Sequence, residues 1–489
     1  MAISVLHISD LHRDPSHEVT SQALLDSLER DRDRYRAEIP AIPDPNIIIV
    51  SGDVVHGVKA NATDPDGELK RQYDQAEAFL IALTDSFVGG NRERVVIIPG
   101  NHDVSFPHAL RGMKLIEVNL STEEQRAAAV ANGRRLLSPS TPMRWSWAGF
   151  CFYEIIDKGL YDARLEAFCT FYGQFYQGKR SYSLNPEEQF DVFDYPEHNI
   201  TIAGLSSCHE NDPFNKQGAI HPECVAAAAR RLCEPKYRDR FLFAVWHHNT
   251  SGGPTKSDYM DADILQVLID DGFSLGFHGH QHKPQFIEER FQFGGTRKIT
   301  VISASTLCAG PRELPTGQSR GYNLLEFDAA TRKAKLHQRK MENENFGRPI
   351  WGPGQFPSSR HSFVEFDVQA PIERKHSVED ANAIGSAEAF LRTGKPKEAI
   401  ELLRPLMGGN SLAKKLLWEC YVALGDNLAI IADFYPPQAV AEIVHVADAL
   451  WEEGNRLQLK ELLKLDAVCN SSDPAVVKVR ELYNARLSP

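Results

Sequence analysis

The sequence lacks several features that mark secreted or membrane proteins. Its eight cysteines include no C-x-x-C pair, and such scattered cysteines are typical of reduced, mostly buried thiols in a reducing compartment. No apolar run comes near the ~18 residues that a membrane span needs. The chain enters its first predicted strand too early to leave room for a signal peptide. We therefore expect a cytoplasmic protein with no membrane contact.

The sequence also lacks an excess of basic residues. It has 66 acidic and 54 basic side chains and a formal net charge of −12, so it gains no general electrostatic attraction for nucleic acid. This weakens a nucleic-acid-binding hypothesis without excluding it, because a metal site attracts phosphates locally. The length of 489 residues and the 42% hydrophobic content suffice for two or three domains of about 100–200 residues.

The first hundred residues alternate between buried strands and helices. Apolar runs at 3–9, 47–50 and 95–98 predict strands, and the segments 20–39 and 72–87 have helical periodicity. A βαβαβ order is typical of a parallel sheet buried on both faces. We therefore expect an α/β fold. Further strands are predicted at 200–205, 241–246, 272–277, 298–303 and 321–327.

The strand pattern lapses between residues 104 and 199, which we interpret as an insertion or cap. Residues 110–137 are predicted to be helical, and residues 145–195 are dense in aromatic side chains. Those aromatics either form a subcore of helices and hairpins or cap a functional site. We expect substrate choice to lie in this insertion.

The C-terminal part differs in composition. The first domain is expected to span 1–345, followed by a linker at 346–376 that is rich in Gly, Pro, Ser and Asn, and by a helical domain at 377–489. Three glycines, Gly394, Gly425 and Gly454, end successive amphipathic runs at spacings of 31 (425 − 394) and 29 (454 − 425) residues. This resembles degenerate tetratricopeptide-like hairpins of about 34 residues, and a small helical bundle is the alternative. Such repeats usually bind a protein partner.

Potential metal ligands follow five of the predicted strands. They are Asp10 with His12, Asp53, Asn101 with His102, His247, and His280 with His282. Taken singly, each has a simpler explanation, such as a helix N-cap for an Asp or a surface turn for a His. Strand ends at one edge of an α/β layer converge, however, so these ligands can meet. Apart from His102, the set supplies two carboxylates, one amide oxygen and four imidazoles. These are too many for one tetrahedral zinc and suit two cations.

The blocks Asp-x-His, Gly-Asp, Gly-Asn-His-Asp, a single His region and Gly-His-x-His occur here in that order. They resemble the motif set of the calcineurin-like metallophosphoesterase family over residues 1–340. The resemblance implies two packed mixed β-sheets flanked by helices (an α/β, or α+β, sandwich), with a dinuclear metal site at the strand ends. The all-α C-terminal domain would follow this fold.

The resemblance also implies how the ligands divide. Asp10, His12 and His282 would hold one divalent cation, Asn101, His247 and His280 the other, and Asp53 would bridge them. Mn or an Fe-containing pair is favoured by the family, while Zn, Ni and Co fit the ligand types. The family's fourth block usually reads His-x-Pro, whereas this chain has His247-His248-Asn249. That departure leaves His247 and His248 as alternatives, and we prefer His247, the first residue after the strand.

Two further residues would act just outside the metals. The resemblance implies that His102 protonates the leaving alkoxide or stabilises the phosphoryl charge, and that Asp103 orients the His102 imidazole. Together these inferences predict a hydrolase of phosphodiesters, of a nucleotide type or another small kind. The alternatives are a DNA or RNA nuclease of the DNA-repair branch, a phosphomonoesterase, and a non-catalytic metal-stabilised scaffold.

Overall fold

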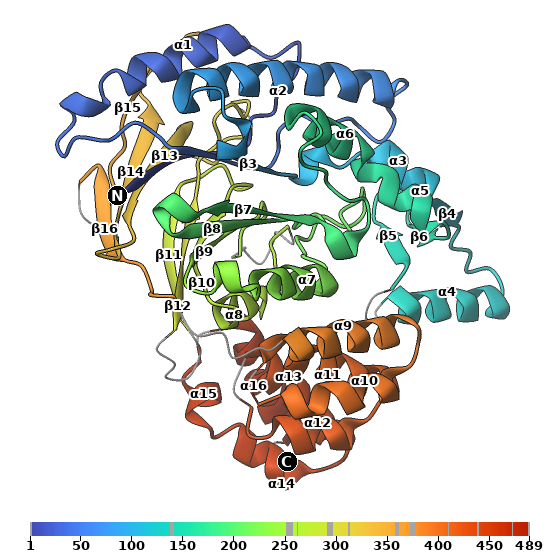
Figure 1. Ribbon diagram of the computed structural model, residues 1–489. Coiled ribbons are helices and arrows are strands. Elements are labelled where there is room, and N and C mark those ends of the chain that lie inside the picture. The colour runs from blue at the N-terminus through green and yellow to red at the C-terminus, as the bar shows by residue number, and fades with distance from the viewer. Residues whose placement is uncertain are drawn as a thin grey trace. The chain divides into compact units, whose positions relative to one another are not determined.

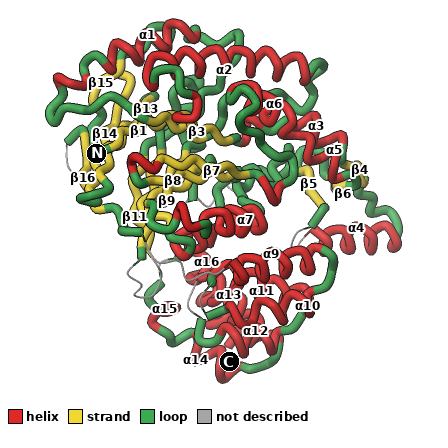
Figure 2. Tube along the Cα trace, in the orientation of Figure 1, coloured by secondary structure: helices red, strands yellow, loops and turns green. Residues whose placement is uncertain are grey.

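The computed structural model describes residues 2–136, 141–250, 258–261, 263–290, 297–311, 313–356, 361–371, 378–408, 410–437, 440–471 and 473–487. The chain divides into two compact units, the first made of most of residues 1–382 and the second of most of residues 383–489. The first unit contains the β-sheets, and the second is built from helices (Figures 1 and 2).

The first sheet has the strand order β15-β14-β13-β1-β2-β3, with β16 beside β14. Its strands are β1 (Ile3–Ile8), β2 (Ile47–Ser51), β3 (Val95–Ile98), β13 (Gly321–Asp328), β14 (Lys333–Met341), β15 (Trp351–Pro353) and β16 (Phe363–Asp367). Strands β1, β2 and β3 are parallel, as the βαβαβ pattern predicts. All their residues are buried, which explains why they read as nearly continuous apolar runs.

The second sheet has the order β11-β12-β10-β9-β8-β7. Its strands are β7 (Phe190–Tyr195), β8 (Ile200–Leu205), β9 (Phe241–Val245), β10 (Phe273–His278), β11 (Gln285–Arg290) and β12 (Lys298–Ser303). The ring of Phe327 on β13 lies 5.0 Å from that of Phe241 and 5.5 Å from that of Phe243, both on β9. The two mixed sheets therefore pack face to face around one core, and the predicted fold class is confirmed.

Helices flank both sheets (Figure 1). They are α1 (Ser21–Arg32), α2 (Pro65–Val88) and α6 (Glu166–Phe175) beside the first sheet, and α7 (Pro222–Leu232) and α8 (Asp263–Asp270) beside the second. Helix α2 begins seven residues before the predicted start because Pro65 occupies its first turn and Asp64 caps it, accepting a hydrogen bond from the Gly67 N–H at 3.1 Å. Helix α1 ends at Arg32, short of the predicted residue 39.

The insertion forms a small sheet of its own, in the order β4-β6-β5. Its elements are α3 (Phe106–Arg111), β4 (Met113–Ile116), α4 (Glu123–Leu136), β5 (Met143–Ser146), β6 (Cys151–Ile155) and α5 (Lys158–Asp162). The prediction that 110–137 is helical is confirmed for α4 and wrong for β4. Strand β4 pairs with the distant β6, and local periodicity carries no information on such a pairing.

The aromatic side chains of α6 confirm the packing interpretation for that part of the insertion. They are Phe168, Phe171, Tyr172 and Phe175, and all four are buried in the main core. Phe171 stacks on Tyr73 of α2 with ring centroids 5.1 Å apart. These aromatics pack α6 against α2 and the main core, and do not cap the ligand cluster.

The segment predicted as a linker contributes two strands to the first sheet. Both β15 and β16 pair antiparallel with β14. Pro353 ends β15, a position where a missing N–H is tolerated at the margin of a sheet. The Gly- and Pro-rich composition thus predicted a linker where the structure has two strands at the edge of the sheet.

The second unit is built from helices, several of which pack against the next helix along the chain. Its helices are α9 (Val378–Arg392), α10 (Pro396–Leu403), α11 (Ser411–Leu424), α12 (Asn427–Phe434), α13 (Val440–Glu452), α14 (Arg456–Leu462), α15 (Asp466–Cys469) and α16 (Pro474–Leu487). Gly394, Gly425 and Gly454 have φ of 75°, 65° and 71° and follow α9, α11 and α13, as left-handed C-terminal caps do. The tetratricopeptide-like character and the protein partner stay predictions. Within the described residues, no helix combines the length and apolar character that crossing a bilayer requires.

A buried ionic cluster ties α1 to the first sheet. The Asp31 carboxylate is fully buried and accepts hydrogen bonds from Arg339 Nε of β14 at 2.9 Å and from the Tyr322 hydroxyl of β13. Arg339 also donates to Glu38 at 2.7 Å. The partners are more than 290 residues apart in the sequence. The cluster therefore fixes helix α1 to strands β13 and β14 of the first sheet.

We expect Asp31→Ala to lower the free energy of unfolding of the first unit by about 3 kcal/mol or more, because it leaves the buried Arg339 charge without its main partner. Denaturant unfolding would measure the change. Asp44→Ala is the matched control, since the Arg36–Asp44 pair is 84% and 51% exposed and such pairs contribute about 1 kcal/mol or less. Equal losses in both variants would contradict this account.

Candidate metal centre

The ligands predicted from the sequence meet where strands of both sheets end. Asp10 follows β1, Asp53 follows β2, and His280 follows β10. The backbone N–H of His280 donates to both carboxylate oxygens of Asp10 at 3.2 Å. The Asp10 N–H donates in turn to the Gly52 carbonyl at 3.1 Å. These contacts link the residue after β1 to the segment after β2 in the same sheet and to the segment after β10 in the other sheet.

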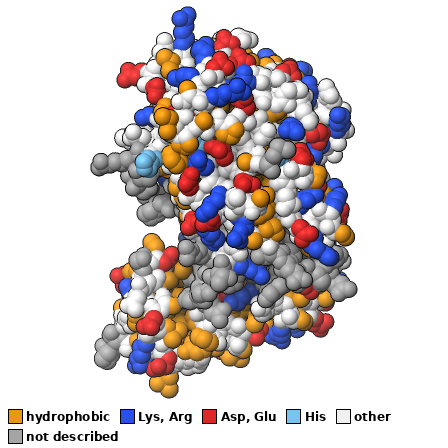
Figure 3. Space-filling model, turned by 60° about the vertical axis from the view of Figure 1, so that its left-hand side comes forward, with side chains coloured by type: hydrophobic (Ala, Val, Ile, Leu, Met, Phe, Trp, Pro, Cys, Tyr) orange, Lys and Arg blue, Asp and Glu red, His pale blue; other side chains and the backbone are white. Residues whose placement is uncertain are grey.

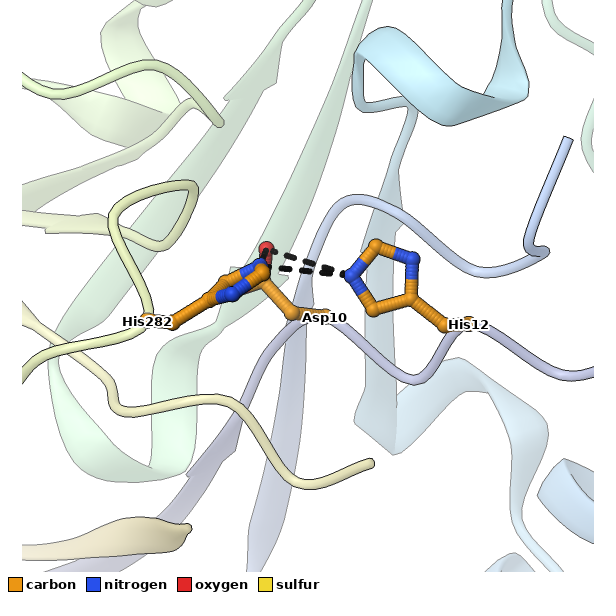
Figure 4. A group of neighbouring side chains, drawn as sticks. All are labelled: Asp10, His12 and His282. Atoms are coloured by element: carbon orange, nitrogen blue, oxygen red, sulfur yellow. Dashed lines mark hydrogen bonds and ion pairs between the residues drawn. The ribbon is translucent and has the colours of Figure 1, made fainter. Parts of the chain in front are cut away.

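A first group contains Asp10, His12 and His282 (Figure 4). Nε2 of His282 lies 3.3 Å from Oδ1 of Asp10, and Nε2 of His12 lies 4.0 Å from the same oxygen. The two Nε2 atoms are 3.3 Å apart. One carboxylate oxygen and two imidazole nitrogens thus face a common point, and all three side chains can contact one cation.

A second group is centred on the Asn101 amide. Its Oδ1 lies 3.0 Å from Nε2 of His247 and 2.9 Å from Nδ1 of His280. Asn101 itself belongs to a short 3₁₀ helix, Asn101–Asp103, directly after β3. This second group therefore brings one amide oxygen and two imidazole nitrogens together.

Asp53 lies between the two groups. Its Oδ2 is 3.3 Å from Nε2 of His247 and 4.0 Å from Nε2 of His12. Its other oxygen, Oδ1, accepts a hydrogen bond from the His102 N–H at 2.8 Å. The side chain is thus held by the backbone while Oδ2 faces both groups.

Backbone carbonyls orient the imidazoles of both groups. Nδ1 of His247 donates to the Ser51 carbonyl at 2.8 Å, and Nδ1 of His282 donates to the Glu313 carbonyl at 2.9 Å. Because a carbonyl only accepts, Nδ1 of each ring carries a proton, and Nε2 is the nitrogen that would bind a cation once its own proton has left. For His280 the orientation is reversed, with Nδ1 toward Asn101 and Nε2 3.4 Å from Oδ2 of Asp258.

The geometry favours His247 over His248 as the ligand. The Ser207 hydroxyl oxygen accepts from the N–H groups of both histidines, and it lies 2.9 Å from Nδ1 of His248. The hydroxyl proton is thus directed to the His248 ring. His248 is fully buried and its pKa is lowered well below 6.5, mainly by burial. It has a structural partner, whereas the His247 Nε2 atom faces Asp53 and Asn101.

The expected role of Asp103 is not supported by its contacts. Its carboxylate accepts hydrogen bonds from the Gly100 N–H at 2.8 Å, the Val54 N–H at 3.1 Å and the Tyr73 hydroxyl at 2.9 Å. The His102 ring instead donates from Nδ1 to the backbone carbonyl of His56 at 2.6 Å. Asp103 therefore fixes the loop that carries Asn101, and a carbonyl orients the His102 imidazole.

Several ligands occupy strained backbone conformations. The residues with positive φ are Asp10 (54°), His12 (43°), Asp53 (52°), His280 (73°) and His282 (54°). Such conformations persist where the surrounding structure imposes them, and they concentrate at functional sites. Gly52 has a φ of 94°, and a Cβ there would lie 2.5 Å from Nδ1 of His247. The Gly-Asp block thus needs its glycine for both the turn and the space.

Charges within the cluster reinforce one another. Burial opposes ionisation of Asp10, but the imidazoles of His282 and His247 hold the pKa of that carboxyl well below its usual range. Conversely, burial lowers the pKa of His282 while Asp10 raises it more, to about 9. The carboxylates therefore stay ionised and attract positive charge, as a cation site requires.

A cavity of about 680 Å³ adjoins this cluster. Asn101 and His102 form part of its lining, together with Lys59, Asn211 and Lys216. The loop around residue 211 was not recognised from the sequence, because its residues carry no motif. A cavity of this volume beside the cluster is of a size typical of small-molecule sites.

The sequence matches one known protein family, and its likeness to solved structures is distant. The family described as calcineurin-like phosphoesterase matches residues 3–284. None of the curated proteins matches the chain. A point mutant of Vps29 from Entamoeba histolytica is 11% identical, covers 75% of this chain and 100% of its own, and has a TM-score of 0.25. The calcineurin-like phosphoesterase YfkN from Bacillus subtilis is 9% identical, covers 79% and 97%, and has a TM-score of 0.29.

The assignment to a family rests on the sequence match, because these TM-scores are too low to carry an argument. The match covers more than half of the chain and includes every ligand block described above. The chain belongs to the calcineurin-like phosphoesterase family, whose members are metal-dependent phosphoesterases.

Proposed function

We propose that this protein hydrolyses small phosphodiesters, of a nucleotide type or similar, with two divalent cations. The observation that carries the proposal is the place of Asp53 Oδ2, 3.3 Å from His247 and 4.0 Å from His12. An oxygen that faces both groups is suited to bridge two cations, whereas a single-cation site would need neither the second group nor a shared carboxylate.

The residues present fit such a pair of metals. Asp10, His12 and His282 would hold one cation, Asn101, His247 and His280 the other, and Asp53 would bridge them. Mixed carboxylate, amide and imidazole donors suit Mn or an Fe-containing pair and also accept Zn, Ni or Co. When bound, two such cations lower the pKa of a water and neutralise phosphate oxygens during in-line attack.

His102 is the proposed acid. Its Nδ1–H is fixed by the His56 carbonyl at 2.6 Å, so Nε2 is the nitrogen available to exchange a proton. In the imidazolium form, Nε2–H can protonate a leaving alkoxide, which a poor leaving group requires. The ring lies 4.6 Å from that of His12, edge to face, and it also lines the cavity. These positions support proton delivery on the cavity side of the phosphorus.

The cavity favours a small diester over a polymer. About 680 Å³ is within the range of about 300–1,000 Å³ for small-molecule sites. A nuclease would need a basic track for the backbone. On the face of the molecule in Figure 3, basic and acidic side chains are interspersed, and the net charge is −12. We therefore place a small phosphodiester ahead of nucleic acid.

We expect protein stripped of metal and reloaded with Mn²⁺ to hydrolyse bis(4-nitrophenyl) phosphate faster than 4-nitrophenyl phosphate. Release of 4-nitrophenolate would report both rates, and metal-free protein would serve as the control. Turnover of the monoester alone would support a phosphatase. Absence of turnover with two metals bound per chain would favour the scaffold alternative.

We expect Asp53→Asn to reduce the bound metal from two equivalents to one or fewer, because the amide removes the charge that both groups share. Turnover should fall by about 10³-fold or more, since both cations act on the same phosphoryl group. Elemental analysis and kinetics on one sample would test this. Asp44→Asn, at an exposed pair, is the isosteric control. Full metal content and turnover in Asp53→Asn would refute the dinuclear assignment.

We expect His102→Gln to keep both metals but lose about 10²–10⁴-fold in turnover of diesters with alkoxide leaving groups, the range typical of general acids. The loss should be much smaller for 4-nitrophenolate, which leaves without protonation. Measuring kcat for both substrates separates an acid from a merely structural residue. Equal losses for the two leaving groups would contradict the proposed role.

A further inference from the structure

One wall of the cavity is a single loop, residues 209–217, that follows β8. Four of its residues line the cavity, namely Asn211, Asp212, Asn215 and Lys216. The lining also includes His56 and Lys59 from the loop after β2, and Asn101 and His102 from the ligand cluster. The position of the 209–217 loop therefore sets the shape of the space beside His102.

The loop is folded around the Asp212 carboxylate. Oδ1 of Asp212 accepts hydrogen bonds from the Phe214 N–H at 2.8 Å and the Asn215 N–H at 2.9 Å. The Asn211 side-chain amide donates to the Gln217 carbonyl at 2.6 Å. These bonds use one oxygen of Asp212 for the loop and leave Oδ2 for partners outside it.

Those outside partners come from the insertion. Nε of Arg144, on β5, donates to Oδ2 of Asp212 at 2.8 Å, and its Nη2 lies 3.3 Å from Oε2 of Glu210. The Tyr161 hydroxyl, on α5, donates to the same Oδ2 at 2.9 Å. Arg144 is 5% exposed and Asp212 is fully buried, so water does not compete for this pair.

Two more contacts hold the loop to the insertion. The ring of Tyr153 on β6 stacks on Phe214, with centroids 4.3 Å apart and planes 23° apart. Nε of Arg164 donates to the Asn211 carbonyl at 3.1 Å. The insertion therefore contacts the loop through charge, hydrogen bonds and stacking, although Arg144 and Tyr153 are not among the residues that line the cavity.

We propose that Arg144 is a positioning residue that determines substrate choice: through Asp212 it holds the 209–217 loop as the wall of a subsite for the leaving group of the phosphodiester. This inference rests on the proposed function and adds the class of leaving group to it. The cavity of about 680 Å³ is lined by Val58, Ala60 and Phe106 as well as by Lys59, Asn61 and Lys216. Apolar surface with a few polar side chains suits an alcohol of nucleoside size.

The physical basis is that Arg144 acts on the wall and not on the phosphorus. Its loss leaves a buried carboxylate without a cation, so the loop is expected to shift while the metal ligands, held by the strand ends, stay in place. A leaving group that fills the cavity would then bind and orient poorly. A small leaving group, which makes few contacts with the wall, would react as before.

The test compares Arg144→Met with the unaltered protein, both loaded with Mn²⁺, on two substrates. One is thymidylyl-thymidine, whose leaving group is a nucleoside, and the other is bis(4-nitrophenyl) phosphate. We expect kcat/KM for the dinucleoside to fall by about 10-fold to 10²-fold, mainly through KM, and kcat/KM for the chromogenic diester to change by about 2-fold or less.

Two further variants distinguish a loss of loop positioning from misfolding of the protein. Tyr161→Phe removes one hydrogen bond to Asp212 without stranding a charge, and should move the same ratio of kcat/KM values in the same direction by a smaller factor. Arg135→Met removes an exposed arginine of the same insertion, paired with Glu154, and should leave the ratio unchanged. Hydrogen exchange of the 209–217 amides should speed up in Arg144→Met while that of β8 and β9 does not.

The outcomes separate the two hypotheses. Turnover of neither substrate by the unaltered protein would contradict the proposed function itself. Turnover of the chromogenic diester without thymidylyl-thymidine would contradict the nucleoside-sized subsite. Equal losses on both substrates in Arg144→Met and Tyr161→Phe, or no loss in either variant, would overturn the positioning role while leaving the phosphodiesterase proposal intact.

Discussion

The site depends on the hydrogen bonds from the His280 N–H to the Asp10 carboxylate, at 3.2 Å to each oxygen. Asp10 ends the first strand of one sheet and His280 follows a strand of the other, 270 residues later. Without this contact the two sheets could pack face to face and still leave their ligands apart. Face-to-face packing, through Phe327 against β9, stabilises the pair of sheets. The contact at the strand ends brings the candidate ligands of the two sheets together.

Much of the fold, and the grouping of the candidate ligands at the strand ends, could be predicted from the sequence because the signals are local. An apolar run followed by Gly-Asp or Gly-Asn-His predicts both a buried strand and the ligand at its end. The partners of Asp103 could not be predicted, since Tyr73 and Val54 contact it only in the folded chain. The same holds for the contact between Arg144 and Asp212, which are 68 residues apart. It also holds for β4, which pairs with β6 within a segment that was expected to be helical.

The centre and the cavity wall are stabilised by different means. Backbone carbonyls and strand ends hold the imidazoles of His247 and His282, so these ligands depend little on the identity of nearby side chains. The 209–217 loop depends instead on the side chains of the insertion, such as Arg144 and Tyr153. Changes in the insertion can therefore alter the cavity while the ligand cluster keeps its geometry.

The left-handed backbone at five of the proposed ligands has a consequence for the amount of folded protein in a cell. Each such residue costs about 1 kcal/mol or more, which is a substantial share of the ~5–15 kcal/mol that keeps a domain folded. Bound cations return free energy to the folded state alone. If these residues bind cations as proposed, the fraction of molecules that stay folded, and so escape degradation, is tied to the supply of metal. A shortage of metal would then lower the amount of this protein as well as the proposed activity.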